Sequence, residues 1–184
     1  MTVKSISITL ASLIVFSLST AQAARSKRGT GTTTSEARAT LKDIDRQAFS
    51  VADEADHLSL FSANMAYSPE AHIEGLETVK DDVNRMVREI NQLEAEHDVL
   101  APWEQHAVDE TLPLLNETAM KTQKAIEYFD ANRNLLWTGE YREDTNEIRK
   151  DSEQIAKTLK DYLKYEKVSN EEQQLKQNMG TPGE

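Results

Sequence analysis

The sequence predicts an all-α protein, an antiparallel up-down-up-down four-helix bundle with long helices. Apolar residues recur at alternating spacings of three and four in four successive stretches, 41–65, 76–100, 108–136 and 141–162. This is the pattern of helices that share an apolar seam. Only a few residues separate the stretches, and short connections force consecutive helices to lie antiparallel. No stretch shows the alternation of a β-strand.

The first two helices are followed by residues with strong positional preferences. Ser68 is a good N-cap and Pro69 suits the first turn of a helix, so we expect the second helix to begin there. The second stripe continues to Leu100 and stops before Pro102, which again suits the first turn of the next helix. Glu104 then lies near the positive end of that helix, where a carboxylate is favourable.

The last two helices carry weaker boundary signals. Pro113 lies inside the third stripe and removes one backbone donor, so we expect either a kink or a helix that starts later than the stripe. Gly139 is expected in the turn before the fourth helix. That helix is expected to fray after Ser169, where the chain becomes rich in Glu and Gln.

The N-terminal residues have the features of a secretory signal peptide. Lys4 precedes an apolar run at 6–18, and Ala21-Gln22-Ala23 is the small-x-small pattern that signal peptidase cleaves. The apolar run is shorter than the roughly 20 residues of a membrane-spanning helix. We therefore predict export and cleavage after Ala23, which gives a secreted or periplasmic protein without stable membrane insertion. The alternative is a retained N-terminal anchor.

The predicted organisation is a signal peptide at 1–23, a flexible linker at 24–34, the four-helix bundle at 35–178 and a disordered tail at 179–184. The linker begins with the basic run Arg25-Ser26-Lys27-Arg28 and continues with only Gly and Thr, which cannot form a core. The basic run is either a solvated tail or a dibasic processing site.

Composition disfavours or excludes several functions. A formal net charge of −11 repels phosphate backbones, so nucleic-acid binding is disfavoured. The chain has no cysteine, which excludes thiol catalysis, iron–sulfur clusters and covalently attached c-type haem. Because small secreted eukaryotic domains commonly contain disulfides, the absence of cysteine favours a bacterial cell envelope over eukaryotic secretion.

Two Glu-x-x-His pairs, Glu54–His57 and Glu94–His97, have the spacing that ferritin-like di-iron bundles use on two of their helices. His57 is expected on an outer face, two residues beyond the inward Ala55. Pairing the antiparallel helices around Pro69 places His97 level with Leu41 rather than with His57. The two pairs are then several turns apart, and we predict no di-metal centre.

His97 is the most informative polar residue of the predicted seam. It is expected to face inward where the second and third helices meet, at the level of Gln105 and Glu166, with Glu94 and His106 able to approach. Such a group is either a partly wet polar layer that caps the core or the site of a single metal ion. We predict the polar layer, with no metal ligand assigned, and keep the metal site as the alternative.

The opposite end of the bundle is expected to carry a second polar layer. His72 faces inward there, near Arg133 and Tyr141. Trp103 and Trp137 lie beside the second and third connections, where a Trp usually closes the end of a core.

The middle of the bundle is lined by small or hydroxylated residues, Ala55, Ala119, Thr122 and Ser152. Such residues either let the helices approach closely or leave a cavity for a hydrophobic ligand. Close packing is the favoured interpretation. No inward pair of His and Met lies at that level, so noncovalent haem binding is not expected.

No catalytic motif is present. The sequence contains no Gly-x-Ser-x-Gly, no phosphate-binding glycine-rich loop and no His-Glu-x-x-His. We therefore predict a protein that is not an enzyme, with no catalytic residue and no cofactor. The expected function is binding or structural interaction in the cell envelope, with a protein partner. The alternative is a metal-binding bundle that uses His97 and nearby carboxylates.

Overall fold

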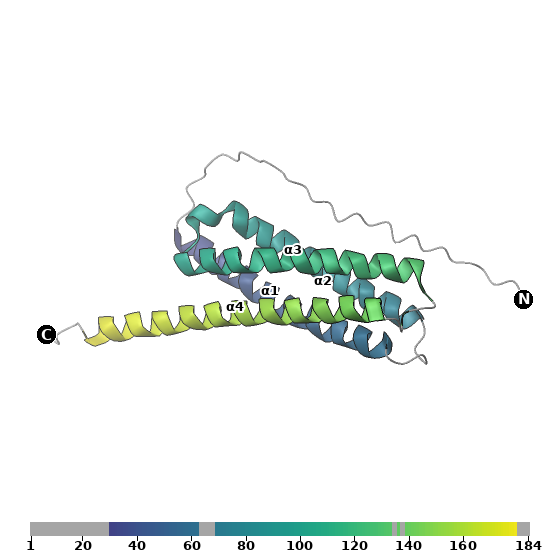
Figure 1. Cartoon of the computed structure of the whole chain (residues 1–184). Coiled ribbons are helices and arrows are strands. Elements are labelled where there is room, and N and C mark those ends of the chain that lie inside the picture. The colour runs from purple at the N-terminus through teal and green to yellow at the C-terminus, as the bar shows by residue number, and fades with distance from the viewer. Residues whose placement is uncertain (1–29, 63–68, 134–135, 137–138, 180–184) are drawn as a thin grey trace, which may run out of the picture.

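The computed structural model describes residues 30–62, 69–133, 136 and 139–179, with side chains from residue 35 onward. The four α-helices are α1 Thr30–Ser62, α2 Pro69–Ala95, α3 Pro102–Ala131 and α4 Gly139–Met179, and a short 3₁₀ helix, η1 His97–Val99, lies between α2 and α3. Helix α1 packs against α2 and α4, and α3 packs against the same two helices (Figure 1). The predicted all-α four-helix bundle is confirmed.

The two proline boundaries are confirmed. Helix α2 begins at Pro69 and α3 begins at Pro102. At the start of α3, the Glu104 carboxylate accepts a hydrogen bond of 2.8 Å from the backbone N–H of Ala101. This bond satisfies one of the donors that a helix N-terminus leaves without a partner. The predicted N-cap Ser68 lies outside the described residues.

Two helices are longer than the sequence predicted. Helix α1 begins at Thr30, inside the expected linker, and α4 continues to Met179 instead of fraying after Ser169. Extending an existing helix costs far less than nucleating one, so weak helix formers such as Gly and Thr are tolerated at its start. In α4, ion pairs one turn apart, such as Lys176–Glu172 at 2.6 Å, support the polar extension. The predicted signal peptide, most of the linker and residues 180–184 lie outside the described residues.

Helix α3 differs from expectation at both ends. It runs without interruption from Pro102 through the exposed Pro113, so the later start that Pro113 suggested is wrong. The helix ends at Ala131, and Arg133 lies beyond it, exposed, with its guanidinium 5.3 Å from the centre of the Phe129 ring. The prediction that Arg133 faces inward is therefore wrong, because the helical spacing on which it rested has already ended.

The core follows the predicted seams of all four helices. The middle layer of Ala55, Ala119, Thr122 and Ser152 is at most 2% exposed, and Thr122 Oγ1 donates a hydrogen bond of 2.8 Å to the Thr118 carbonyl. In the rest of the core, burial of each large aliphatic side chain contributes about 1.5–3 kcal/mol to the free energy of folding. Nearer one end, Gly75 lies against Glu54 and Leu58 of α1, so closely that a Cβ there would overlap both side chains.

The two ends of the bundle are built differently. We call the end around His72, Phe129 and Tyr141 the closed end, because all three residues are at most 3% exposed. We call the other end, with η1 and the start of α3, the open end. There α4 runs past the other three helices (Figure 1). From Asn170 to Met179 every residue of α4 is exposed.

Candidate functional site: a groove at the open end and the helix that continues it

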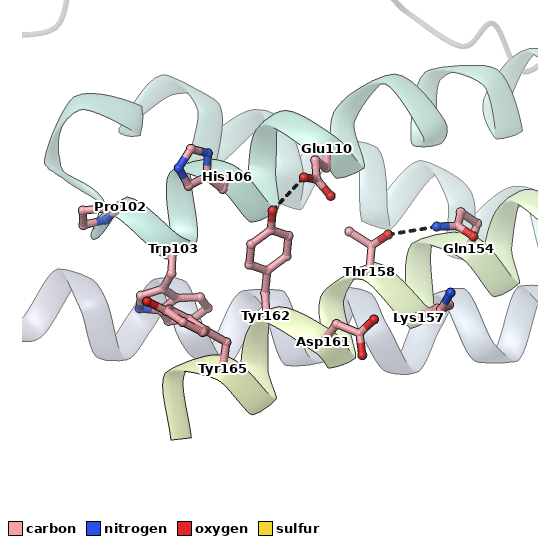
Figure 2. A pocket seen from close by; sticks show the side chains of 10 residues that line it. All are labelled: Pro102, Trp103, His106, Glu110, Gln154, Lys157, Thr158, Asp161, Tyr162 and Tyr165. Carbon is pink, nitrogen blue, oxygen red and sulfur yellow. Dashed lines mark hydrogen bonds between the residues drawn. The ribbon is translucent and has the colours of Figure 1, made fainter. Parts of the chain in front are cut away.

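A groove of about 590 Å³ lies between the first turns of α3 and the last buried turns of α4. Its lining combines aromatic rings with carboxylate, amide and ammonium groups: Pro102, Trp103, His106 and Glu110 from α3, and Gln154, Lys157, Thr158, Asp161, Tyr162 and Tyr165 from α4. Figure 2 shows Trp103 and Tyr165 at one end of the groove and Gln154 and Lys157 at the other. Concave sites with an apolar surface and a few fixed polar groups are typical binding sites.

The centre of the groove is fixed by a hydrogen bond between its two walls. The hydroxyl of Tyr162 donates to Glu110 Oε1 at 2.7 Å, which joins α4 to α3 (Figure 2). Burial, together with the neighbouring Glu110 carboxylate, raises the pKa of the Tyr162 hydroxyl to about 12. The hydroxyl therefore remains a protonated donor at neutral pH, and the bond to Glu110 persists.

The α4 wall of the groove belongs to a second stripe with heptad spacing, which we call the outer seam and half of whose positions are apolar. Its eight positions follow alternating spacings of four and three, and they are Gln154, Thr158, Asp161, Tyr165, Val168, Glu172, Leu175 and Met179. The first four line the groove. Of the last four, Val168, Leu175 and Met179 are 54%, 60% and 80% exposed. Among the described residues, no other helix covers the last four positions of this heptad pattern.

Sequence reasoning missed this seam because it followed only the inward stripe of α4. That stripe ends at Tyr162, where the fourth helix leaves the bundle. The sequence nevertheless contains this seam, because Tyr165, Val168, Leu175 and Met179 fit a three-and-four spacing that is displaced by one residue from the inward stripe of the same helix. Trp103, expected to close the core, is half-buried and lines the groove. Trp137 lies outside the described residues.

His97 does not lie in the core. Helix α2 ends at Ala95 and the chain tightens into η1, which rotates His97 out of the predicted seam and leaves its side chain 30% exposed. Its Nε2 forms a hydrogen bond of 3.1 Å with Asp109 Oδ1, a partner the sequence did not suggest. The prediction of an inward His97 is wrong, because it assumed α-helical spacing up to Leu100.

The residues expected around His97 divide into two groups. Glu94 does approach it, and Gln105 Nε2 donates a hydrogen bond of 3.0 Å to the His97 carbonyl oxygen. Glu166 instead forms an ion pair of 3.0 Å with Arg38 of α1. His106 is exposed and lines the groove.

Within the described residues, one group of three potential metal ligands is found, and it consists of Glu94, His97 and Asp109. The other Glu-x-x-His pair, Glu54 and His57, is separated by 3.8 Å and His57 is exposed on the outer face, as predicted. Among the described residues, the Glu54–His57 pair does not join the group around His97.

A buried carboxyl group lies beside the groove. Glu104 is fully buried, and its Oε1 has no hydrogen-bond partner in the structure. Burial raises the pKa of the Glu104 carboxyl, the hydrogen bond from Ala101 opposes this, and the nearby Glu166 raises the pKa further. The open end therefore holds a carboxyl group that is costly to ionise.

The closed end holds the second predicted polar layer. His72 is 2% exposed, and its Nδ1 lies 3.2 Å from the Tyr141 hydroxyl. Phe61 packs edge-on to the imidazole at 6.0 Å between ring centres. Burial lowers the pKa of His72 and raises the pKa of Tyr141, so both groups are neutral at pH 7. The inward prediction for His72 is confirmed, and the residue is part of a packed aromatic cluster.

The described residues form a four-helix bundle with a groove at its open end and an exposed stripe along the end of α4. Comparison with protein-family models, with curated proteins and with solved structures finds no match. No helix among the described residues is long and apolar enough to cross a membrane.

Proposed function

We propose that the protein is an exported interaction protein that acts by helix–helix association through its open end. The outer seam of α4 supports this most strongly, because eight positions keep heptad spacing over 26 residues, half in a groove and half beyond the bundle. Exposure of such apolar side chains to water is unfavourable, and covering them with another helix would stabilise the protein. Placing an amphipathic helix in a groove is a common mode of recognition.

The occupant that the sequence of α4 favours is α4 of a second copy, lying antiparallel. In this arrangement the extension of each copy fills the groove of the other, and the contact is symmetric. In this register, Tyr165 of one copy faces Val168 of the other, Thr158 faces Leu175, and Gln154 faces Met179. A parallel pairing would leave both grooves empty and join only about two heptads, which is short for a stable coiled coil.

The charge of the extension is compatible with this pairing. Residues 163–179 contain three Lys and three Glu, a net charge of zero in a chain whose formal net charge is −11. The extension can therefore approach the acidic body of a second copy without strong repulsion. Beside the seam, Glu171 of one copy lies two residues from the level of Lys164 of the other. Asp161 lies level with Glu172, whose charge is offset by its ion pair with Lys176 at 2.6 Å.

Sedimentation velocity of the mature chain tests this proposal. We expect a dimer whose population rises with protein concentration, and a monomer at all concentrations for the double variant Val168→Glu, Leu175→Glu. The matched control is Met120→Glu, which places the same charge at a 68% exposed position of α3 off the seam. Met120→Glu should dimerise like the parent. A parent chain that stays monomeric at every concentration would refute the second copy as the partner.

The signal-peptide features at residues 1–23 support export to the cell envelope or the medium. Mass spectrometry of the protein recovered from the native host, or from a bacterial host that exports it, measures the N-terminus directly. We expect a chain that begins at Ala24. A full-length chain retained in the membrane fraction would instead identify an uncleaved anchor.

A further inference from the structure

A cluster of three potential metal ligands lies at the corner between α2 and α3. Glu94, His97 and Asp109 each offer a ligand atom, and the three atoms lie within 4.8 Å of one another. His97 Nε2 and Asp109 Oδ1 are already 3.1 Å apart. Ligand atoms around a tetrahedral zinc ion are about 3.3 Å apart, because Zn–N and Zn–O bonds are about 2.0–2.2 Å long. A small movement of the exposed Glu94 side chain brings all three to one ion.

The backbone around His97 is fixed by hydrogen bonds. The His97 carbonyl oxygen accepts from the N–H of Leu100 at 3.2 Å and from Gln105 Nε2 at 3.0 Å. Gln105 Nε2 also donates to the Leu100 carbonyl at 3.2 Å. Asp109 stands on the second turn of α3. The imidazole and the Asp109 carboxylate thus project from two ordered elements, which lowers the entropy that metal binding would cost.

The charge at this corner is unbalanced. Residues 89–110 contain seven Asp or Glu and no Lys or Arg. Glu94 and Asp109 are carboxylates that converge on the same imidazole, and like charges this close repel each other unless a cation lies between them. Glu94 approaches His97 because the two residues are three apart in the chain, as are Glu54 and His57. Asp109 comes from α3, and a cation between the two carboxylates would relieve their repulsion.

We propose that Glu94, His97 and Asp109 bind one divalent transition-metal ion of the zinc type, with water completing the coordination. Imidazole is a preferred ligand of Zn²⁺, Cu²⁺ and Ni²⁺, whereas Mg²⁺ and Ca²⁺ take oxygen ligands. The bound ion ties the end of α2 and η1 to α3, and so braces the corner beside the groove. This proposal is independent of the α4 association, because no ligand belongs to α4.

The Glu54–His57 pair provides a comparison within the same chain. It has the same sequence spacing and a separation of 3.8 Å, but within the described residues no third ligand joins it. His57 therefore has the side-chain chemistry of the proposed site without its geometry. His106 is a second control, since it is an exposed histidine near the same corner that lies outside the ligand cluster.

Isothermal titration of the chelator-treated mature chain with Zn²⁺ tests the site, with Mg²⁺ and Ca²⁺ titrated in parallel. We expect one Zn²⁺ per chain and no comparable Mg²⁺ or Ca²⁺ binding. His97→Ala and Asp109→Asn should each weaken Zn²⁺ binding about tenfold or more. His57→Ala and His106→Ala should bind like the parent. Circular dichroism confirms that each variant is folded.

Three results would overturn the metal site: no saturable Zn²⁺ binding by the parent, binding that survives His97→Ala, or binding that is lost in His57→Ala. Co²⁺ gives a second readout, because a four-coordinate ion with a nitrogen ligand has visible absorption bands that should disappear in His97→Ala. Sedimentation of His97→Ala should match that of the parent, so failure of the metal site and failure of the α4 association are distinguishable.

Discussion

The two ends of this bundle start from similar sequence features and reach different structures. Each end was expected to carry an inward histidine in a polar layer. At the closed end, His72 stays in the regular helix, is 2% exposed and meets the Tyr141 hydroxyl. At the open end, the helix stops at Ala95 and His97 turns toward the surface and Asp109. The comparison teaches that the end of the helix, not the residue type, decides whether a histidine belongs to the core or to a surface cluster.

The aromatic residues of the two ends show the same contrast. Tyr141 is fully buried and packs against His72 and Tyr128, while Tyr165 is 62% exposed at the rim of the groove. The closed end therefore contributes to folding stability. The open end keeps apolar surface free, which costs stability unless the surface has a partner.

The largest expected effect comes from removing the ring of Tyr141. Tyr141→Ala leaves a cavity and deprives His72 of its hydrogen bond, so we expect a loss of about 3–5 kcal/mol in the free energy of unfolding. Tyr165→Ala is the matched control, and we expect it to change stability by less than about 0.5 kcal/mol. Urea denaturation at low protein concentration measures both. Equal losses for the two variants would mean that the ends do not differ as described.

The next effect is the opposite pH response of the two ends. Burial lowers the pKa of His72 from its ordinary value of 6.5, so below pH 6.5 the unfolded chain binds more protons than the folded chain. The contribution of His72 to the free energy of unfolding therefore falls as the pH decreases below 6.5. Burial raises the pKa of Glu104 from its ordinary value of 4.5, so above pH 4.5 the folded chain binds more protons than the unfolded chain. The contribution of Glu104 to the free energy of unfolding therefore falls as the pH increases above 4.5.

Substitution of each group isolates its part of the pH profile. Glu104→Gln keeps an acceptor for the Ala101 N–H and removes the buried charge, so at pH 7 it should stabilise the protein by about 1 kcal/mol. His72→Gln should be less stable at pH 7 but lose less stability than the parent on acidification below pH 6.5. Thermal unfolding between pH 4 and pH 8 measures both profiles. A destabilised Glu104→Gln would show that the ionised carboxylate is needed.

Much of this architecture could be predicted from the sequence, because helical spacing and the proline boundaries depend on local physics. Pro69 and Pro102 start helices as expected, and most inward residues of the four seams are buried, although Leu112 and Tyr162 are half-buried within their helices. The candidate sites could be predicted only in part, since Glu94 and His97 were named for a possible metal site but Asp109 and the outer seam were not. Asp109 reaches His97 only because η1 breaks the α-helical spacing, and a 3₁₀ turn of three residues leaves no clear sequence signal.

The smallest expected effect concerns the extension of α4. Leu175→Ala should leave the stability of the monomer within about 0.5 kcal/mol of the parent, because Leu175 is 60% exposed and lies in the part of α4 where every residue is exposed. The same substitution should weaken self-association measurably. Urea denaturation of dilute protein and sedimentation of concentrated protein separate the two effects. A large loss of monomer stability would place Leu175 in the fold rather than in an association surface.

The most direct test of the account is disulfide trapping along the outer seam, which is simple because the chain has no cysteine. In the antiparallel pairing, Asp161 of one copy lies level with Glu172 of the other, and both residues are exposed. A mixture of Asp161→Cys and Glu172→Cys chains should form a cross-linked heterodimer under mild oxidation. Leu175→Cys alone, which reports parallel pairing, should not cross-link efficiently. Efficient cross-linking of Leu175→Cys alone, or none in the mixture, would contradict the proposed association.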